Sequence, residues 1–91
     1  MKGNKPIMSC IDAWFGEEEH KEQTCRTDGR IIWSYELPIA ERTKGNTYRV
    51  LDPAFALKPN GDPSVTTKQH IAMVRKALAV GLVVIVDSIE I

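Results

Sequence analysis

The sequence lacks an excess of either charge. Its 91 residues include 12 lysines and arginines and 12 aspartates and glutamates, so the formal net charge is zero. A general nucleic-acid binder is expected to carry a cationic excess or a basic stripe, and this composition argues against that class. Near-zero charge also removes the repulsion that keeps small proteins apart, which favours self-association or a stable partner.

Long hydrophobic runs are missing as well. The longest apolar run, Leu82–Val86, is far too short to cross a bilayer, and the N-terminal residues lead into no apolar signal-peptide core. We therefore expect a cytoplasmic protein with no membrane partner. Cysteine is scarce, since Cys10 and Cys25 are the only two, and a reducing compartment favours free thiols over a disulfide between them.

Catalytic, metal-binding and nucleotide-binding motifs are absent. Histidine and cysteine occur twice each and form no C-x-x-C or H-x-x-x-H pair, the kind of spacing that zinc sites use. The glycine-rich loops of nucleotide-binding proteins and the G-x-S-x-G of hydrolases are also missing. The sequence therefore predicts a non-enzymatic protein with no cofactor and no metal. Its length predicts one small domain, residues 1–91, that buries roughly 60 to 65% of the unfolded surface.

Hydrophobic periodicity predicts an α+β fold. Residues 31–37 alternate after a turn signal at 28–29, which indicates a half-buried strand. Pro38 removes a hydrogen-bond donor, so this strand ends there or continues with a bulge at a sheet edge. Residues 47–51 alternate again beyond the turn residues 44–46, and the two alternating runs predict a hairpin.

The C-terminal third predicts a helix followed by a strand. Thr66 and Gln69 have the spacing of a capping box at a helix start. An apolar stripe at helical spacing follows, formed by Ile71, Val74 and Leu78. Gly81 is placed to end the helix, and Leu82–Val86 has the composition of a strand buried on both faces. The expected fold is a small antiparallel or mixed sheet of three to four strands, packed by one amphipathic C-terminal helix and followed by a buried final strand.

Three segments are less regular. Residues 7–15 alternate like a strand, yet Ile11, Trp14 and Phe15 also share one helical face, and both interpretations stay open. The polar residues 17–23 predict an exposed helical turn or loop. Residues 52–62 predict an irregular connection whose apolar residues fold back over the core. These apolar residues are Phe55, Ala56 and Leu57.

Aromatic and basic residues suggest a binding surface. Trp33 and Tyr35 are predicted on one strand face near Arg30, Arg42 and Arg49. Aromatic strands flanked by arginines can stack nucleic-acid bases. The strands lack the R-G-F-x-F run of RNA-binding folds, so a core or protein-interface role is favoured over nucleic acid.

The start of the predicted helix gives a second candidate. His70 lies in its first turn, where a neutral imidazole fits the positive end of the helix dipole better than a protonated one. We expect His70 to pack or bond locally rather than to act as an acid or base. Thr66 and Thr67, with the free N–H groups beside them, have the chemistry of an anion site, although every helix start shares that property.

Two short segments carry a resemblance to a known family. They are S-Y-E-L-P-I-A at residues 34–40 and S-V-T-T-K-Q-H-I at residues 64–71. They resemble the S-Y-x-T-x-I-A and S-x-T-T-x-x-H-I patterns of a family of small bacteriophage-associated domains of unknown function. The match covers residues 29–78 and departs at Leu37, where the family carries Thr, and in the longer loop 52–62.

The resemblance implies a phage or mobile-element origin but no activity. If the family pattern is functional, the resemblance implies that Ser34, Tyr35, Thr67 and His70 are the functional positions. Alternatively, Thr67 and His70 form a cap that fixes the helix to the hairpin.

The leading hypothesis is a protein-binding or inhibitor module in the cytoplasm of a bacterial host. It would cover a surface of a host or phage protein, in the manner of an anti-CRISPR protein that counters host defence, and its charge balance favours a homo-oligomer. The alternative is a small-ligand or nucleic-acid-binding protein that uses the aromatic strand and the helix N-terminus. The predicted binding residues are Trp33, Tyr35, Arg42, Arg49, Thr67 and His70.

Overall fold

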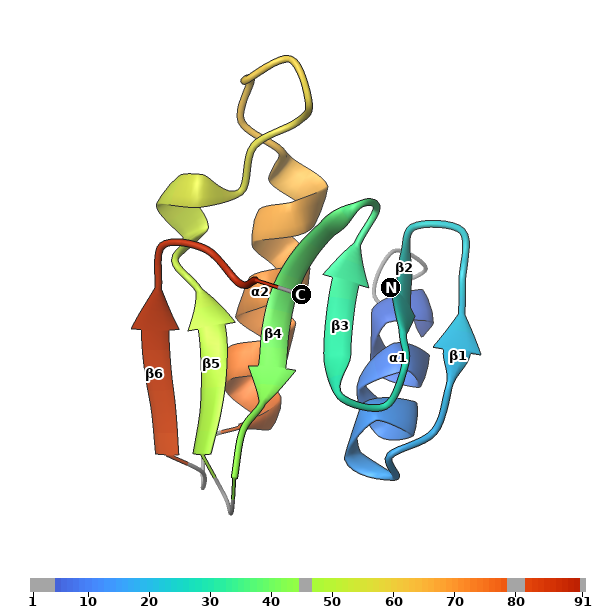
Figure 1. Cartoon of the computed structure of the whole chain (residues 1–91). Coiled ribbons are helices and arrows are strands. Elements are labelled where there is room, and N and C mark those ends of the chain that lie inside the picture. The colour runs from blue at the N-terminus through green and yellow to red at the C-terminus, as the bar shows by residue number, and fades with distance from the viewer. Residues whose placement is uncertain (1–4, 45–46, 79–81, 91) are drawn as a thin grey trace.

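The computed structural model describes residues 5–44, 47–78 and 82–90 (Figure 1). These residues form a six-stranded sheet in which the strands follow their order in the sequence, β1 to β6. The elements are α1 (Lys5–Phe15), β1 (His20–Lys21), β2 (Cys25–Thr27), β3 (Ile31–Ser34), β4 (Leu37–Arg42), β5 (Thr47–Leu51), the 3-10 turn η2 (Pro53–Phe55), α2 (Val65–Ala77) and β6 (Leu82–Val86).

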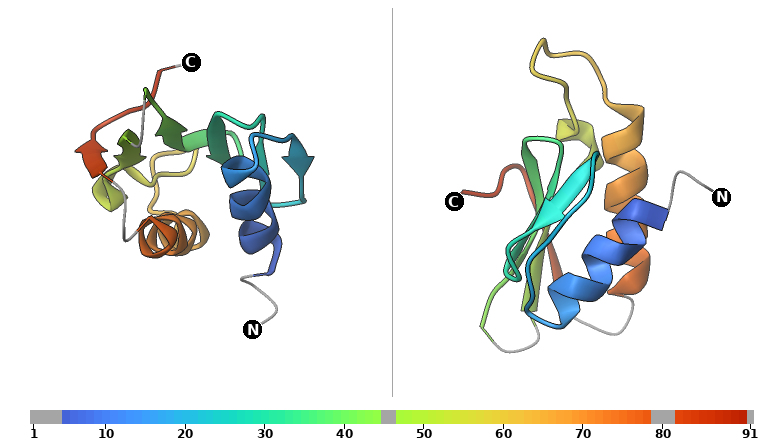
Figure 2. Two further views of the ribbon diagram at one scale, coloured as in Figure 1. Left: turned by 90° about the horizontal axis from the view of Figure 1, so that it is seen from below. Right: turned by 90° about the vertical axis from the view of Figure 1, so that its right-hand side faces the viewer.

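The sheet is mixed and carries both helices on one face. Neighbouring strands from β1 to β5 are antiparallel, whereas β6 runs parallel to β5 because α2 crosses back between them. Figure 2 shows α1 and α2 side by side against one face, while the segment after β6 crosses the opposite face. Ile89 in that segment is buried and joins the core. The predicted α+β class with a mixed sheet is confirmed, but the sheet has more strands than the three to four expected.

The N-terminal segment is a helix, which settles the alternative between helix and strand. Ile7, Cys10, Ile11 and Trp14 recur at helical spacing and are all buried in the core. The Trp14 indole N–H also donates to the Arg30 carbonyl oxygen at 2.7 Å. We expected the C-terminal helix to cover one face of the sheet and the N-terminal segment or a partner to cover the other, whereas α1 lies on the same face as α2 (Figure 2). Strand β1 falls within residues 17–23, where an exposed turn or loop was expected, and β2 follows it.

The two cysteines meet beneath α1. Both Cys10 and Cys25 are buried free thiols, and their sulfur atoms lie 3.3 Å apart in a hydrogen bond. Burial raises the pKa of both thiols, so both stay neutral. The expectation of free thiols agrees with this arrangement.

The predicted strand over residues 31–37 is wrong in its second half. β3 ends at Ser34, the chain reverses through Tyr35 and Glu36, and Leu37 pairs back with Ser34 as the first residue of β4. Tyr35 has a φ of 56°, a left-handed conformation that is uncommon for a residue other than glycine. Since neither turn position carries glycine, asparagine or aspartate, the usual turn signal is missing here.

Pro38 lies inside a strand after all. It sits opposite Trp33 in β4, next to a register shift between Ile32 and Trp33. The expected bulge is therefore present, but β4 is an interior strand between β3 and β5 rather than an edge. The predicted hairpin is confirmed by the antiparallel pairing of β4 with β5, and its turn residues 45–46 lie outside the described residues.

The final strand is correctly predicted over Leu82–Val86, but it is not buried. β6 forms an edge of the sheet, and Leu82, Val84 and Ile85 are 70%, 48% and 43% exposed. The helix α2 packs against β4 and β5, which leaves the strand beyond them largely open. The predicted burial on both faces is therefore wrong.

The helix α2 has the predicted apolar stripe but a different start. Ile71, Val74 and Leu78 are buried as expected. The N-cap is Ser64, whose side chain accepts a hydrogen bond from the Thr67 N–H at 3.2 Å, so the capping box of Thr66 and Gln69 is wrong. Gly81, the predicted helix stop, lies outside the described residues.

The connection before α2 is irregular, as predicted. Only Ala56 of its three apolar residues folds over the core, since Phe55 and Leu57 are about two-fifths exposed. Within the described part of the chain, neither helix combines the length and apolarity needed to cross a bilayer.

The N-cap assignment predicts a difference between two neighbouring hydroxyls. Ser64→Ala should lower the free energy of unfolding by about 1 kcal/mol, because it removes the cap of α2. Thr66→Ala is the matched control and should change it by less than about 0.5 kcal/mol, because Thr66 caps nothing. Urea unfolding of both variants checks this, and equal losses would contradict the assignment.

Candidate functional site

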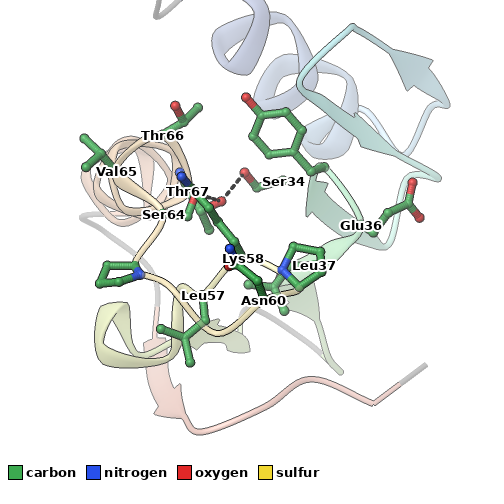
Figure 3. Close-up of a pocket in the computed structure, with 13 residues that line it drawn as sticks. Ser34, Glu36, Leu37, Leu57, Lys58, Asn60, Ser64, Val65, Thr66 and Thr67 are labelled. Atoms are coloured by element: carbon green, nitrogen blue, oxygen red, sulfur yellow. Dashed lines mark hydrogen bonds between the residues drawn. The ribbon is translucent and has the colours of Figure 1, made fainter.

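A buried polar cluster joins the end of β3 to the first turns of α2. The Ser34 hydroxyl lies 2.9 Å from the Thr67 hydroxyl and 2.8 Å from Nδ1 of His70. The Ser64 hydroxyl donates to the Thr67 hydroxyl at 2.9 Å. Ser34, Thr67 and His70 are all at most 2% exposed. Figure 3 shows Ser34, Ser64 and Thr67 of this cluster among the residues that line a groove.

One arrangement of these hydrogen bonds lets every hydroxyl of the cluster donate once. In it Ser64 donates to Thr67, Thr67 donates to Ser34, and Ser34 donates to Nδ1 of His70. That chain requires Nδ1 to be unprotonated. Burial lowers the pKa of His70 below its ordinary value of 6.5, which favours the neutral imidazole that the chain needs.

A groove of about 950 Å³ opens beside this cluster. One wall is the β3–β4 turn and the other is the start of α2, with the loop from Leu57 to Asn60 closing one end (Figure 3). Most of the lining outside the hydroxyl cluster is apolar. The apolar and aromatic lining residues are Tyr35, Leu37, Leu57, Pro59, Pro63 and Val65. Lys58 and Glu36 are the charged residues of the lining, so the formal charges of the lining sum to zero.

A serine bonded to a histidine also occurs in nucleophilic catalytic sites. In this chain the Ser34 residue is 0% exposed, so a substrate in the groove would not reach its hydroxyl. The same hydroxyl is also engaged by Thr67. Among the hydrogen bonds of the described residues, none joins His70 to a carboxylate that would orient it. The arrangement therefore fits the structural alternative that the resemblance allowed, in which Thr67 and His70 fix the helix to the hairpin.

The predicted binding residues do not form one surface. Trp33 is buried, and the Arg26 guanidinium lies over its ring, 4.1 Å from the centroid. Arg49 pairs with Glu41 at 3.9 Å. A ring covered in this way is not open to a nucleic-acid base. The aromatic and basic strand surface suggested by the sequence is therefore not assembled.

Arg42 points to the helix side of the sheet. Its guanidinium donates to the carbonyl oxygens of Trp14 and Gly29, which places a cation at the C-terminal end of α1, where the helix dipole favours it. It borders a second cavity of about 470 Å³ that mixes acidic and basic residues. Arg42 thus holds α1 in place and is remote from the groove.

Tyr35 and Thr67 are the predicted binding residues that line the groove, and His70 is buried and bonded to Ser34 of the lining. Sequence reasoning missed the wall formed by Leu57, Pro59, Pro63 and Val65. The signal was present, since a long proline-containing loop in a small domain is often functional. Among the described residues, no group of three or more histidine, cysteine or acidic side chains is placed to hold a metal ion.

The polar cluster predicts a pH-dependent stability that disappears with His70. Because the pKa of His70 is lowered in the folded state, the unfolded state binds more protons as the pH falls through about 6.5. The free energy of unfolding should therefore drop between about pH 7 and about pH 5. Urea unfolding at both pH values should show a smaller drop for His70→Asn, whose amide can still contact Ser34.

The control is Thr66→Ala, which changes a residue that does not titrate in the first turn of α2 and leaves His70 in place. It should keep the pH dependence of the unmodified protein. An equal pH dependence in His70→Asn and in the unmodified chain would show that His70 is not buried as a neutral group.

Comparison of the chain with protein-family models, with curated proteins and with solved structures finds no match. The resemblance to a phage-associated family therefore stays a prediction, and the site is interpreted from its own geometry.

Proposed function

We propose that the chain is a non-enzymatic protein-binding module whose groove holds an uncharged, extended, apolar segment of a partner protein. The observation that carries this proposal is the groove itself. Its volume of about 950 Å³ lies at the upper end of the range typical of ligand sites, and its mouth exposes several large apolar side chains.

The exposed apolar residues at the mouth favour a partner. Tyr35, Leu57 and Val65 are 49%, 42% and 67% exposed, and all three line the same groove. Gathered apolar surface of this kind marks interaction sites, whereas scattered exposed residues do not. Pro59 and Pro63 stiffen the loop that forms one wall, so less conformational entropy is lost when a partner binds.

The polar groups of the groove favour an apolar occupant. The hydroxyls of Ser34, Ser64 and Thr67 bond to one another and to His70, and no buried side-chain polar atom of the described residues lacks a partner. A polar or charged ligand would therefore have to compete with bonds already made. An aliphatic or proline-containing peptide would not.

The partner's identity belongs to the same proposal. The resemblance to phage-associated domains supports a host or phage protein as the partner and a phage or mobile-element origin, with occlusion of a host-defence component as the biological role. Binding by occlusion needs a surface and no chemistry, which agrees with the inaccessible Ser34.

A second candidate uses the same groove for a small apolar ligand. The groove is concave and combines apolar walls with a few convergent polar groups at the start of α2, which is also the character of small-molecule sites. Nucleic acid is less favoured, because Trp33 is buried and Arg42 is engaged by backbone carbonyls.

The peptide proposal is tested by selection from a random displayed peptide library. Enriched apolar peptides should bind the unmodified protein, and Val65→Glu should weaken that binding at least about tenfold in titration calorimetry. Val65 is the exposed first residue of α2, where a glutamate interacts favourably with the helix dipole. A loss of binding would therefore come from the groove and not from unfolding.

The matched control is Ala72→Glu, the same charge change at an exposed position of α2 outside the groove. It should bind the selected peptides as the unmodified protein does. Failure to enrich any peptide, or equal binding to Val65→Glu, would remove the peptide proposal. Perturbation of groove signals by apolar fragments in NMR spectra, without peptide enrichment, would favour the small-ligand alternative.

A further inference from the structure

The two edges of the sheet are built differently. β1 consists of His20 and Lys21 alone and follows the acidic residues 17–19. A short charged edge of this kind resists pairing with another chain. β6 is longer, carries no charge, proline or glycine, and exposes Leu82, Val84 and Ile85. Its composition is that of an interior strand, yet nothing among the described residues pairs with its outer side.

The hydrogen-bonding groups of this free edge can be assigned. The Val86 carbonyl oxygen accepts from the Asp52 N–H at 2.8 Å, so Val86 directs its backbone groups towards β5. Backbone direction alternates along a strand, so Val84 also faces β5 and the N–H and C=O groups of Val83 and Ile85 point away from the sheet. The free edge therefore offers two residues with both backbone groups available.

We infer that this edge pairs with β6 of a second copy of the chain. An antiparallel pairing about a twofold axis at Val84 places Val83 opposite Ile85 of the partner, and the reverse. Both residues of each such pair have outward backbone groups, so each pair exchanges both of its hydrogen bonds. Val84 faces its own counterpart in the closely spaced, non-bonded position, and Leu82 faces Val86.

The side chains of this pairing match as well as the backbone does. Every cross-strand pair is aliphatic with aliphatic, and such pairs stabilise a sheet while like charges opposite one another would destabilise it. The chain as a whole has no net charge, so approach of two copies meets no long-range repulsion. A strand of another protein could also pair with this edge. Only β6 of a second copy is known from this sequence to place an uncharged aliphatic side chain opposite each residue.

The pairing closes on itself. A twofold contact uses the same edge of both copies, so no second β6 edge remains for further addition. The outer edge of the resulting sheet is the charged β1 at each end. The structure therefore fits a dimer and not a growing fibre. A contact of one strand from each copy is smaller than a standard interface, so we expect a dissociation constant in about the micromolar range.

The test exploits the position of Val84 on the twofold axis. Val84→Lys and Val84→Glu each place like charges opposite one another and should be monomers, whereas an equimolar mixture should recover the dimer through a lysine–glutamate pair. Sedimentation equilibrium at concentrations up to about 100 μM, well above a micromolar dissociation constant, measures the mass. The unmodified chain should reach twice its 10.2 kDa.

Several outcomes would overturn the inference. A monomeric unmodified chain, a dimer that persists in Val84→Lys, or a mixture of the two charge variants that stays monomeric would each do so, as would masses that keep rising beyond the dimer. Val84→Thr keeps a β-branched side chain and should weaken the dimer several-fold with an unchanged circular dichroism spectrum, which separates loss of pairing from loss of fold. The groove shares no residue with β6, so peptide binding by Val84→Lys tests the proposed function separately.

Discussion

The hydroxyl of Ser34 is the contact on which the rest of the site depends. It lies at the end of β3 and bonds to Thr67 and His70, which stand 33 and 36 positions later in the chain. Buried polar groups destabilise a fold unless they are paired. The hydroxyls and the imidazole of the cluster are paired only when α2 has one particular position along its axis relative to β3. That position of α2 sets the distance between the β3–β4 turn and the start of α2, and the groove lies between them.

The sequence predicted those elements whose signal is local and periodic. The helical stripe was found because Ile71, Val74 and Leu78 recur at helical spacing, and all three are buried. Strand β5 was found from the alternation of its residues, and β6 from its continuous run of aliphatic, mostly β-branched residues. The turn at Tyr35 was missed because a tyrosine takes the left-handed conformation that turn signals assign to glycine or asparagine. Strands β1 and β2 are only two and three residues long, too short for an alternating pattern to be recognised.

The candidate site was predictable only in part, for a different reason. Ser34, Tyr35, Thr67 and His70 were marked by a resemblance, and three of them are bonded in one cluster while Tyr35 lines the groove beside it. Periodicity within each element contains no information on how distant elements meet. For Trp33 the sequence favoured a core or protein-interface role over nucleic-acid binding, and the residue is buried with the Arg26 guanidinium over its ring.

The composition of β6 indicated a strand buried on both faces, but the strand lies at an edge of the sheet and exposes Leu82, Val84 and Ile85. Among the described residues, only β5 pairs with it, on one side. Pairing of β6 with a second copy supplies the missing neighbour on its open side. It also joins two grooves in one molecule, because neither groove uses a residue of β6. A partner that presents two apolar segments at a matching separation would then bind both grooves at once, and its second contact would form at the high effective concentration that linkage provides. The sheet edge and the groove would in this way contribute to the same binding function.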